Sequence, residues 1–179
     1  MIQNLRFNFA ALILLAAAFL ISSVTNANAQ RRTKPKPKSV AVVKTDLLTE
    51  ERKQGAKDVG VQLKNISKFV FVLGGIATGI EEIDKDVRSG KASKEFADKN
   101  AAFKSDVIRS IRALRAGLVK LEVDFRVKEG LKPYLVNIQG IIDDTARAED
   151  SALAGRFNQS GKELLVVVEK LTDVLVEMP

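Results

Sequence analysis

Apolar residues recur at alternating spacings of three and four positions along most of the chain, starting near Val59. Such spacing keeps one face of a helix apolar over several turns, whereas a half-buried strand would alternate polar and apolar residues. No proline interrupts the chain between Lys38 and Lys132. Four apolar stripes result, over residues 59–80, 96–125, 131–145 and 157–178. The pattern therefore predicts an all-α fold.

Glycine, serine and proline residues mark the expected ends of these helices. Gly90 can close the first helix, and Ser93 can cap the second. Gly130 can close the second helix, with Pro133 in the first turn of the third. Residues 158–161 are polar or glycine and should separate the last two helices.

Ser160 and Glu163 have the spacing of a capping box, which favours a helix start near residue 161. Gly55 and Gly60 could divide the first helix into a short lead-in and a main helix. Because the connections are short, neighbouring helices should be antiparallel. We therefore expect one domain, residues 45–179, folded as an up-down-up-down antiparallel four-helix bundle with long first and second helices. Its helices are expected near residues 46–88, 93–129, 133–157 and 161–178.

The first 29 residues have the features of a secretory signal peptide. Arg6 precedes an apolar stretch, and small residues at Ala27 and Ala29 fit a signal peptidase, which predicts cleavage before Gln30. The alternative is an uncleaved membrane anchor over residues 7–24, near the lower length limit for a spanning helix. An exported chain without cysteine favours a bacterial envelope, so the expected location is periplasmic or secreted.

Most of the net charge of +7 lies in the segment that follows, residues 30–44. Two prolines and mutual repulsion of the cations predict an extended, disordered tether. Such a tether can adhere to an anionic polymer or membrane surface, or can serve only as a solvated spacer. No aromatic residue is interleaved for base stacking, which argues against specific nucleic-acid recognition. The candidate anion-binding cations are Arg31, Arg32, Lys34, Lys36 and Lys38.

The composition excludes several kinds of chemistry. The chain has no His and no Cys, so imidazole bases, thiolate nucleophiles, zinc fingers and Cys-ligated clusters are excluded. Carboxylates cluster at residues 81–86 and 143–150, but a di-metal bundle site would also require histidine. We therefore expect no catalytic residues, no metal site and no cofactor, and we do not expect an enzyme.

Two apolar features are candidates for interaction. Val119, Val123 and Val127 lie on the side of the second helix opposite its main stripe, so either another element covers them or they form a protein interface, with homodimerisation the first form to test. Residues 69–80 carry no charge and are apolar on all sides, which favours a packed core helix over a membrane-inserting hairpin or a dimer seam.

Charge also divides between helices. Residues 99–135 have nine basic and four acidic side chains, and residues 136–179 have four basic and eight acidic. This division favours attraction between neighbouring helices, with an anion-binding strip at Arg109, Arg112 and Lys120 as the alternative.

The sequence as a whole favours an exported, non-enzymatic helical bundle that binds or scaffolds in the bacterial cell envelope. The expected partners are a second copy or an envelope protein, and an anionic surface through the tail. One alternative is a ligand carrier or sensor with a pocket between helices near Gly74 and Gly75. The other is a membrane protein held by its uncleaved N-terminal segment.

Overall fold

A computed structural model describes residues 40–179 of the chain. The predicted signal peptide, its cleavage site and the five cations of the tail lie outside the described residues. No strand occurs within residues 40–179, so the prediction of an all-α fold is confirmed for this part of the chain. Its elements are α2 (Val40–Arg88), α3 (Lys94–Val127), the 3-10 turn η2 (Lys132–Tyr134), α4 (Leu135–Ile138), α5 (Ile141–Leu153) and α6 (Phe157–Glu177).

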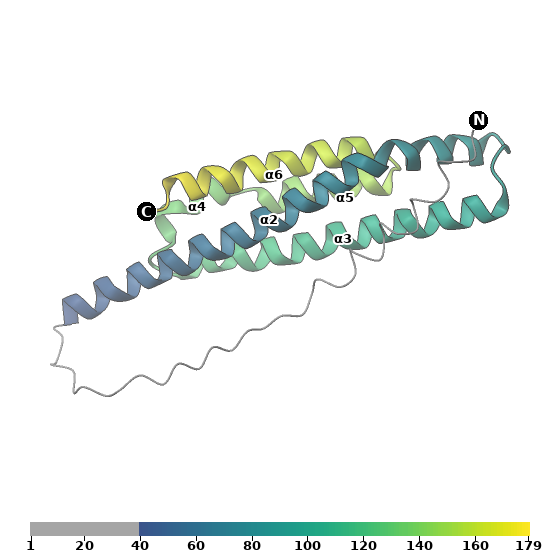
Figure 1. Ribbon diagram of the computed structural model, residues 1–179. Coiled ribbons are helices and arrows are strands. Elements are labelled where there is room, and N and C mark those ends of the chain that lie inside the picture. The colour runs from purple at the N-terminus through teal and green to yellow at the C-terminus, as the bar shows by residue number, and fades with distance from the viewer. Residues whose placement is uncertain (1–39) are drawn as a thin grey trace. The chain divides into compact units, whose positions relative to one another are not determined.

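The long helices lie side by side as a bundle in which α3 packs against α2 and α5, and α6 packs against the same two helices (Figure 1). Lys104, in the first third of α3, contacts Asp84 near the end of α2, whereas Gly130, just after α3, contacts Glu51 near the start of α2. α2 and α3 are therefore antiparallel. Contacts between the start of α6 and the end of α2 give the same relation for that pair.

The core consists of apolar side chains from all four predicted stripes. Phe125 and Phe157 are its largest fully buried members, with Ile66 of α2 and Ile141 of α5 packed in the same cluster. Burying side chains of this size stabilises a fold by roughly 1.5–3 kcal/mol each. The stripes therefore correctly predicted which faces of the helices are buried.

α2 is longer and more continuous than expected. It begins at Val40, so residues 40–44, expected in the tether, are helical. Neither Gly55 nor Gly60 breaks it. A Cβ atom on Gly55 would overlap the side chain of the buried Leu131, so the missing side chain at this position lets the chain after α3 pack against α2.

The first helix ends and the second one begins as expected. Gly90 has a φ of +70°, in the left-handed region that favours glycine, and it follows the last turn of α2. Ser93 is the N-cap of α3, and its side chain accepts a hydrogen bond from the backbone N–H of Phe96 at 3.4 Å.

The third predicted helix, 133–157, is wrong as one element. The chain forms η2 and α4 and then breaks at Gly140, whose φ is +83°, before α5 begins. α5 ends at Leu153, and Gly155, with a φ of +74°, makes the turn into α6. Positive φ ends a right-handed helix, and glycine adopts it without the steric cost of a side chain.

The predicted start of the last helix near 161 is also wrong. α6 begins at Phe157, so Ser160 lies inside the helix, fully buried, and does not cap it. Glu163, the expected partner of Ser160 in the capping box, instead accepts a hydrogen bond from Ser151 of α5 at 3.1 Å. The polar run at residues 158–161 therefore belongs to a helix that packs through its small residues.

Candidate interaction surfaces

The three valines predicted as a protein interface lie on the outer side of α3. Val119, Val123 and Val127 are 40%, 52% and 65% exposed. The core of α3 is formed by residues on the opposite side, including Leu118 and Phe125, which are fully buried. No other element of residues 40–179 covers these valines, so the expectation of a covering element is wrong for the part of the chain that the structure describes. They form an apolar stripe on the surface, which we call the α3 valine stripe.

The segment 69–80 is only half buried, which corrects the expectation of a core helix. Leu73, Ala77 and Ile80 face the core, but Phe71 is 85% exposed and Val72 is 40% exposed. The segment has two apolar sides. One of them packs in the bundle, and the other faces solvent. Periodicity alone could not tell an apolar face that has a neighbour from one that lacks it.

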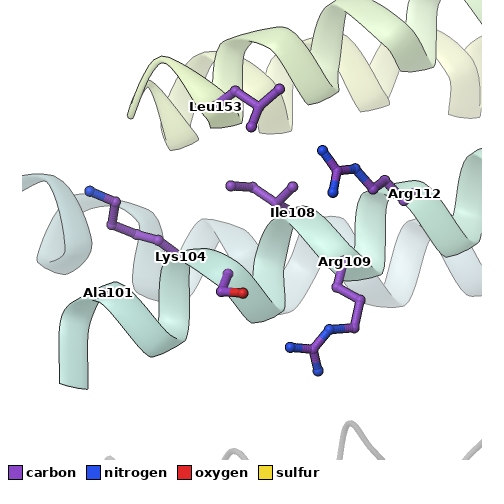
Figure 2. A pocket seen from close by; sticks show the side chains of 7 residues that line it. Ala101, Lys104, Ile108, Arg109, Arg112 and Leu153 are labelled. Atoms are coloured by element: carbon purple, nitrogen blue, oxygen red, sulfur yellow. The ribbon is translucent and has the colours of Figure 1, made fainter. Parts of the chain in front are cut away.

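Gly74 and Gly75 are exposed on α2, and a Cβ atom built on either one would meet nothing within 4 Å. A pocket with a volume of about 400 Å³ lies elsewhere, between α3 and the end of α5 (Figure 2). Leu153 faces Ile108 across it, and Arg109 points away from α5. Its lining residues are Ala101, Lys104, Ser105, Ile108, Arg109, Arg112 and Leu153.

The cations around this pocket are already paired with carboxylates of the same chain. A bound anion would therefore compete with existing ion pairs, which weakens the case for an anion-binding strip on α3. The pairs are Lys104 with Asp84 at 2.8 Å, Arg109 with Asp106 at 3.2 Å and Arg112 with Glu149 at 2.6 Å.

Ion pairs between helices support the favoured interpretation, that opposite charges hold neighbouring helices together. Glu149 of α5 is 9% exposed and receives both Arg112 and Arg115 of α3. Asp144 of α5 is 4% exposed and receives Lys170 of α6 at 2.5 Å. Both of these carboxylates are on α5, so ion pairs connect this short helix to α3 and to α6.

A side chain of α2 satisfies the start of α6. The carboxylate of Glu81 accepts hydrogen bonds from the backbone N–H of Asn158 at 2.9 Å and from its side-chain amide at 3.0 Å. No side chain of α6 itself caps this helix. Partial burial raises the pKa of Glu81, but the hydrogen bonds from Asn158 and Phe157 outweigh it, so the pKa lies below its usual value. Sequence reasoning missed this cap because it joins residues 77 positions apart.

The end of the bundle near Glu81 also holds a buried polar cluster. Asn100 is 2% exposed and donates to the Asp84 carboxylate at 2.7 Å and to the carbonyl of Ile80 at 3.3 Å. Lys104 completes the cluster on Asp84. These contacts fix the register of α2 against α3. The cluster does not place a nucleophilic side chain against a general base, so it resembles a structural contact and not a catalytic site.

The described part of the chain contains no group of three acidic, histidine or cysteine side chains placed to hold a metal ion. Within residues 40–179, no helix is both long enough and apolar enough to cross a membrane. Comparisons with protein-family models, with curated proteins and with solved structures gave no match for this chain.

Proposed function

We propose that this protein is an exported, non-enzymatic helical bundle that acts by binding or scaffolding in the bacterial cell envelope. The α3 valine stripe contacts a protein partner, and the basic tail, residues 30–38, adheres to an anionic surface. The observation that carries the proposal is the exposure of Val119, Val123 and Val127, because contiguous apolar surface on a folded domain marks an interaction site.

A second copy of the chain is the partner to test first. In a two-fold symmetric dimer the same stripe meets itself, so one continuous helical stripe is sufficient to form the contact. The three valines follow one another at intervals of four residues, which allows two such helices to pack along their length. An envelope protein with a complementary apolar surface is the alternative occupant.

The test compares association of the wild type with that of a variant in which all three valines are changed to threonine. Threonine keeps the β-branched shape and adds a hydroxyl, so the fold should persist while the stripe becomes polar. Light scattering after size exclusion measures self-association, and crosslinking in envelope extract measures partner capture. We expect the variant to lose both.

The matched control changes Val136 and Val176 to threonine, because these residues are 72% and 78% exposed on α4 and α6. Equal loss in the control and the stripe variant would contradict the proposal, as would a wild type that neither self-associates nor crosslinks. Deletion of residues 30–38 tests the tail, and adhesion to anionic surfaces should then fall and depend less on salt. Intact mass of the exported protein tests cleavage before Gln30.

A further inference from the structure

The outer side of α2 carries lysines and apolar residues on one continuous face. Its residues follow one another at spacings of four, three, four, three and four, which keep them on one side of a helix. All of them are exposed, and the buried residues Val59, Ile66 and Leu73 lie on the other side. This face, which we call the basic face of α2, consists of Lys57, Val61, Lys64, Lys68, Phe71 and Gly75.

The charge of this face is of one sign. Between Lys53 and Ile80 the only acidic residue in the sequence is Asp58, which is half-buried and accepts a hydrogen bond from Gln54 at 2.9 Å. The basic face itself therefore carries three exposed lysines and no acidic residue. A partner that covers it must supply negative charge.

The apolar part of the face protrudes. Phe71 is 85% exposed and Val61 is 53% exposed, and Val72, the neighbour of Phe71 in the sequence, is 40% exposed. Gly74 and Gly75 follow Phe71 at the next turn, and nothing lies within 4 Å of where their side chains would be. No neighbouring side chain of α2 on that turn therefore screens the aromatic ring. The partner that covers this face must also offer an apolar environment to the phenyl ring of Phe71.

A second copy of the chain does not meet both requirements. In a symmetric contact, the lysines of one copy would face those of the other, and like charges in contact oppose association. The interface of an anionic bilayer meets both, because phosphates attract ammonium groups while the hydrocarbon boundary accepts aromatic and aliphatic side chains. Lysine stems can lie along such a boundary while their charged ends reach the headgroups.

We propose that the basic face of α2 docks the folded bundle on the surface of an anionic phospholipid membrane. Phe71 enters the headgroup region, and Lys57, Lys64 and Lys68 contact lipid phosphates. α2 then lies along the membrane plane without crossing it. This inference deepens the proposed function by naming a partner for the bundle itself, and it rests on that function for access to an envelope membrane.

The chain contains no tryptophan, so one introduced indole reports on a single position. The protein, purified as its bacterial host processes it, carries Phe71→Trp and is mixed with vesicles of phosphatidylglycerol and phosphatidylcholine or of phosphatidylcholine alone. We expect a blue shift of the emission on the anionic vesicles only. The matched reporter is Val176→Trp on α6, whose emission should not move.

Co-sedimentation with the same vesicles measures affinity. Each lysine near an anionic surface contributes about a fivefold change in binding, so changing Lys57, Lys64 and Lys68 to glutamine should weaken it about 100-fold. Phe71→Ser should weaken it at least roughly tenfold. The matched charge control changes three exposed lysines outside α2 to glutamine, and it should retain most of the binding. These lysines are Lys91, Lys94 and Lys162. Helix ellipticity confirms that each variant is folded.

The outcomes separate this inference from the proposed function of the tail. An emission shift of the Phe71→Trp reporter that survives deletion of residues 30–38 supports the α2 face even if the tail proves dispensable. Vesicle binding that needs the tail, with no shift of this reporter, overturns the inference and leaves the tail proposal standing. Equal shifts of the reporters at positions 71 and 176, or equal losses in the two lysine variants, also overturn it. So does a concentration-dependent shift of the Phe71→Trp reporter without lipid.

Discussion

Removing the two arginines that contact Glu149 should destabilise the bundle more than removing Glu149 itself. The Glu149 side chain is 12% exposed, whereas those of Arg112 and Arg115 are 59% and 41% exposed. When Glu149 is replaced by methionine, water can solvate both guanidinium groups. When both arginines are replaced by methionine, the carboxylate stays in the contact between α3 and α5 without a cation.

The magnitudes follow from this difference in exposure. An exposed ion pair contributes up to about 1 kcal/mol, so Glu149→Met should lower the free energy of unfolding by about that amount. Leaving a buried charge without its partner costs roughly 3–5 kcal/mol. Because Glu149 keeps a small contact with water, we expect about 3 kcal/mol for the double arginine variant. Methionine is a good helix former, so helix propensity changes little in either case.

Urea unfolding followed by helix ellipticity measures both variants. A third variant, with methionine at all three positions, should recover most of the stability that the double arginine variant loses, because no unpaired carboxylate remains in this contact between α3 and α5. Equal losses in the first two variants, or a larger loss for Glu149→Met, would refute the reasoning. Failure of the third variant to recover stability would show that packing of the arginine stems, and not charge, holds α3 to α5.

Three further changes test particular contacts. Glu81→Gln should lower the free energy of unfolding by about 1 kcal/mol at pH 7, measured by urea unfolding. Because folding lowers the pKa of Glu81, the stabilisation by its carboxylate is present above about pH 4.5 and is lost as the pH falls through the folded pKa. The difference from wild type should therefore shrink in acid, and a constant difference would contradict the role of this charge. Gly130→Ala should cost about 1–3 kcal/mol by the same measurement, since its Cβ would lie 2.7 Å from the backbone oxygen of Leu48, and a neutral result would show that this contact can relax. Gly60→Ala should instead raise the thermal midpoint, with a gain of about 0.5–1 kcal/mol, because a Cβ there meets nothing within 4 Å inside a helix.

The buried faces of the helices could be predicted because apolar spacing reports on burial directly. Ile66, Ile111 and Leu164 lie on the predicted stripes and are all fully buried. Two helix boundaries could not be predicted because they depend on tertiary contacts. The chain turns at Gly155 and not, as expected, at residues 158–161. α6 can begin at Phe157 without a capping side chain of its own because Glu81 of α2 accepts the hydrogen bond of the Asn158 N–H. A capping-box pattern does not tell whether its serine faces solvent or the core.

The α3 valine stripe could be predicted because its residues lie on the side of the helix opposite the core stripe. The basic face of α2 was missed although its signal is present, since Lys57, Lys64 and Phe71 already share one side in the sequence. The uncharged run at residues 69–80 has a buried side and an exposed side, but its hydrophobicity is similar on both and does not distinguish them. Only the positions of α3 and α6 decide which of those sides is buried.

α2 has 49 residues and α6 has 21, so α2 is about 73 Å long against about 32 Å for the helix beside it. The first turns of α2, around Leu47, are exposed, and the last turns pair mainly with the start of α3 (Figure 1). Backbone hydrogen bonds in these parts can open without disrupting the four-helix centre. Amide protons should therefore exchange with solvent fastest at both ends of α2 and slowest around Ile66, and a protease should trim the ends while the centre stays folded.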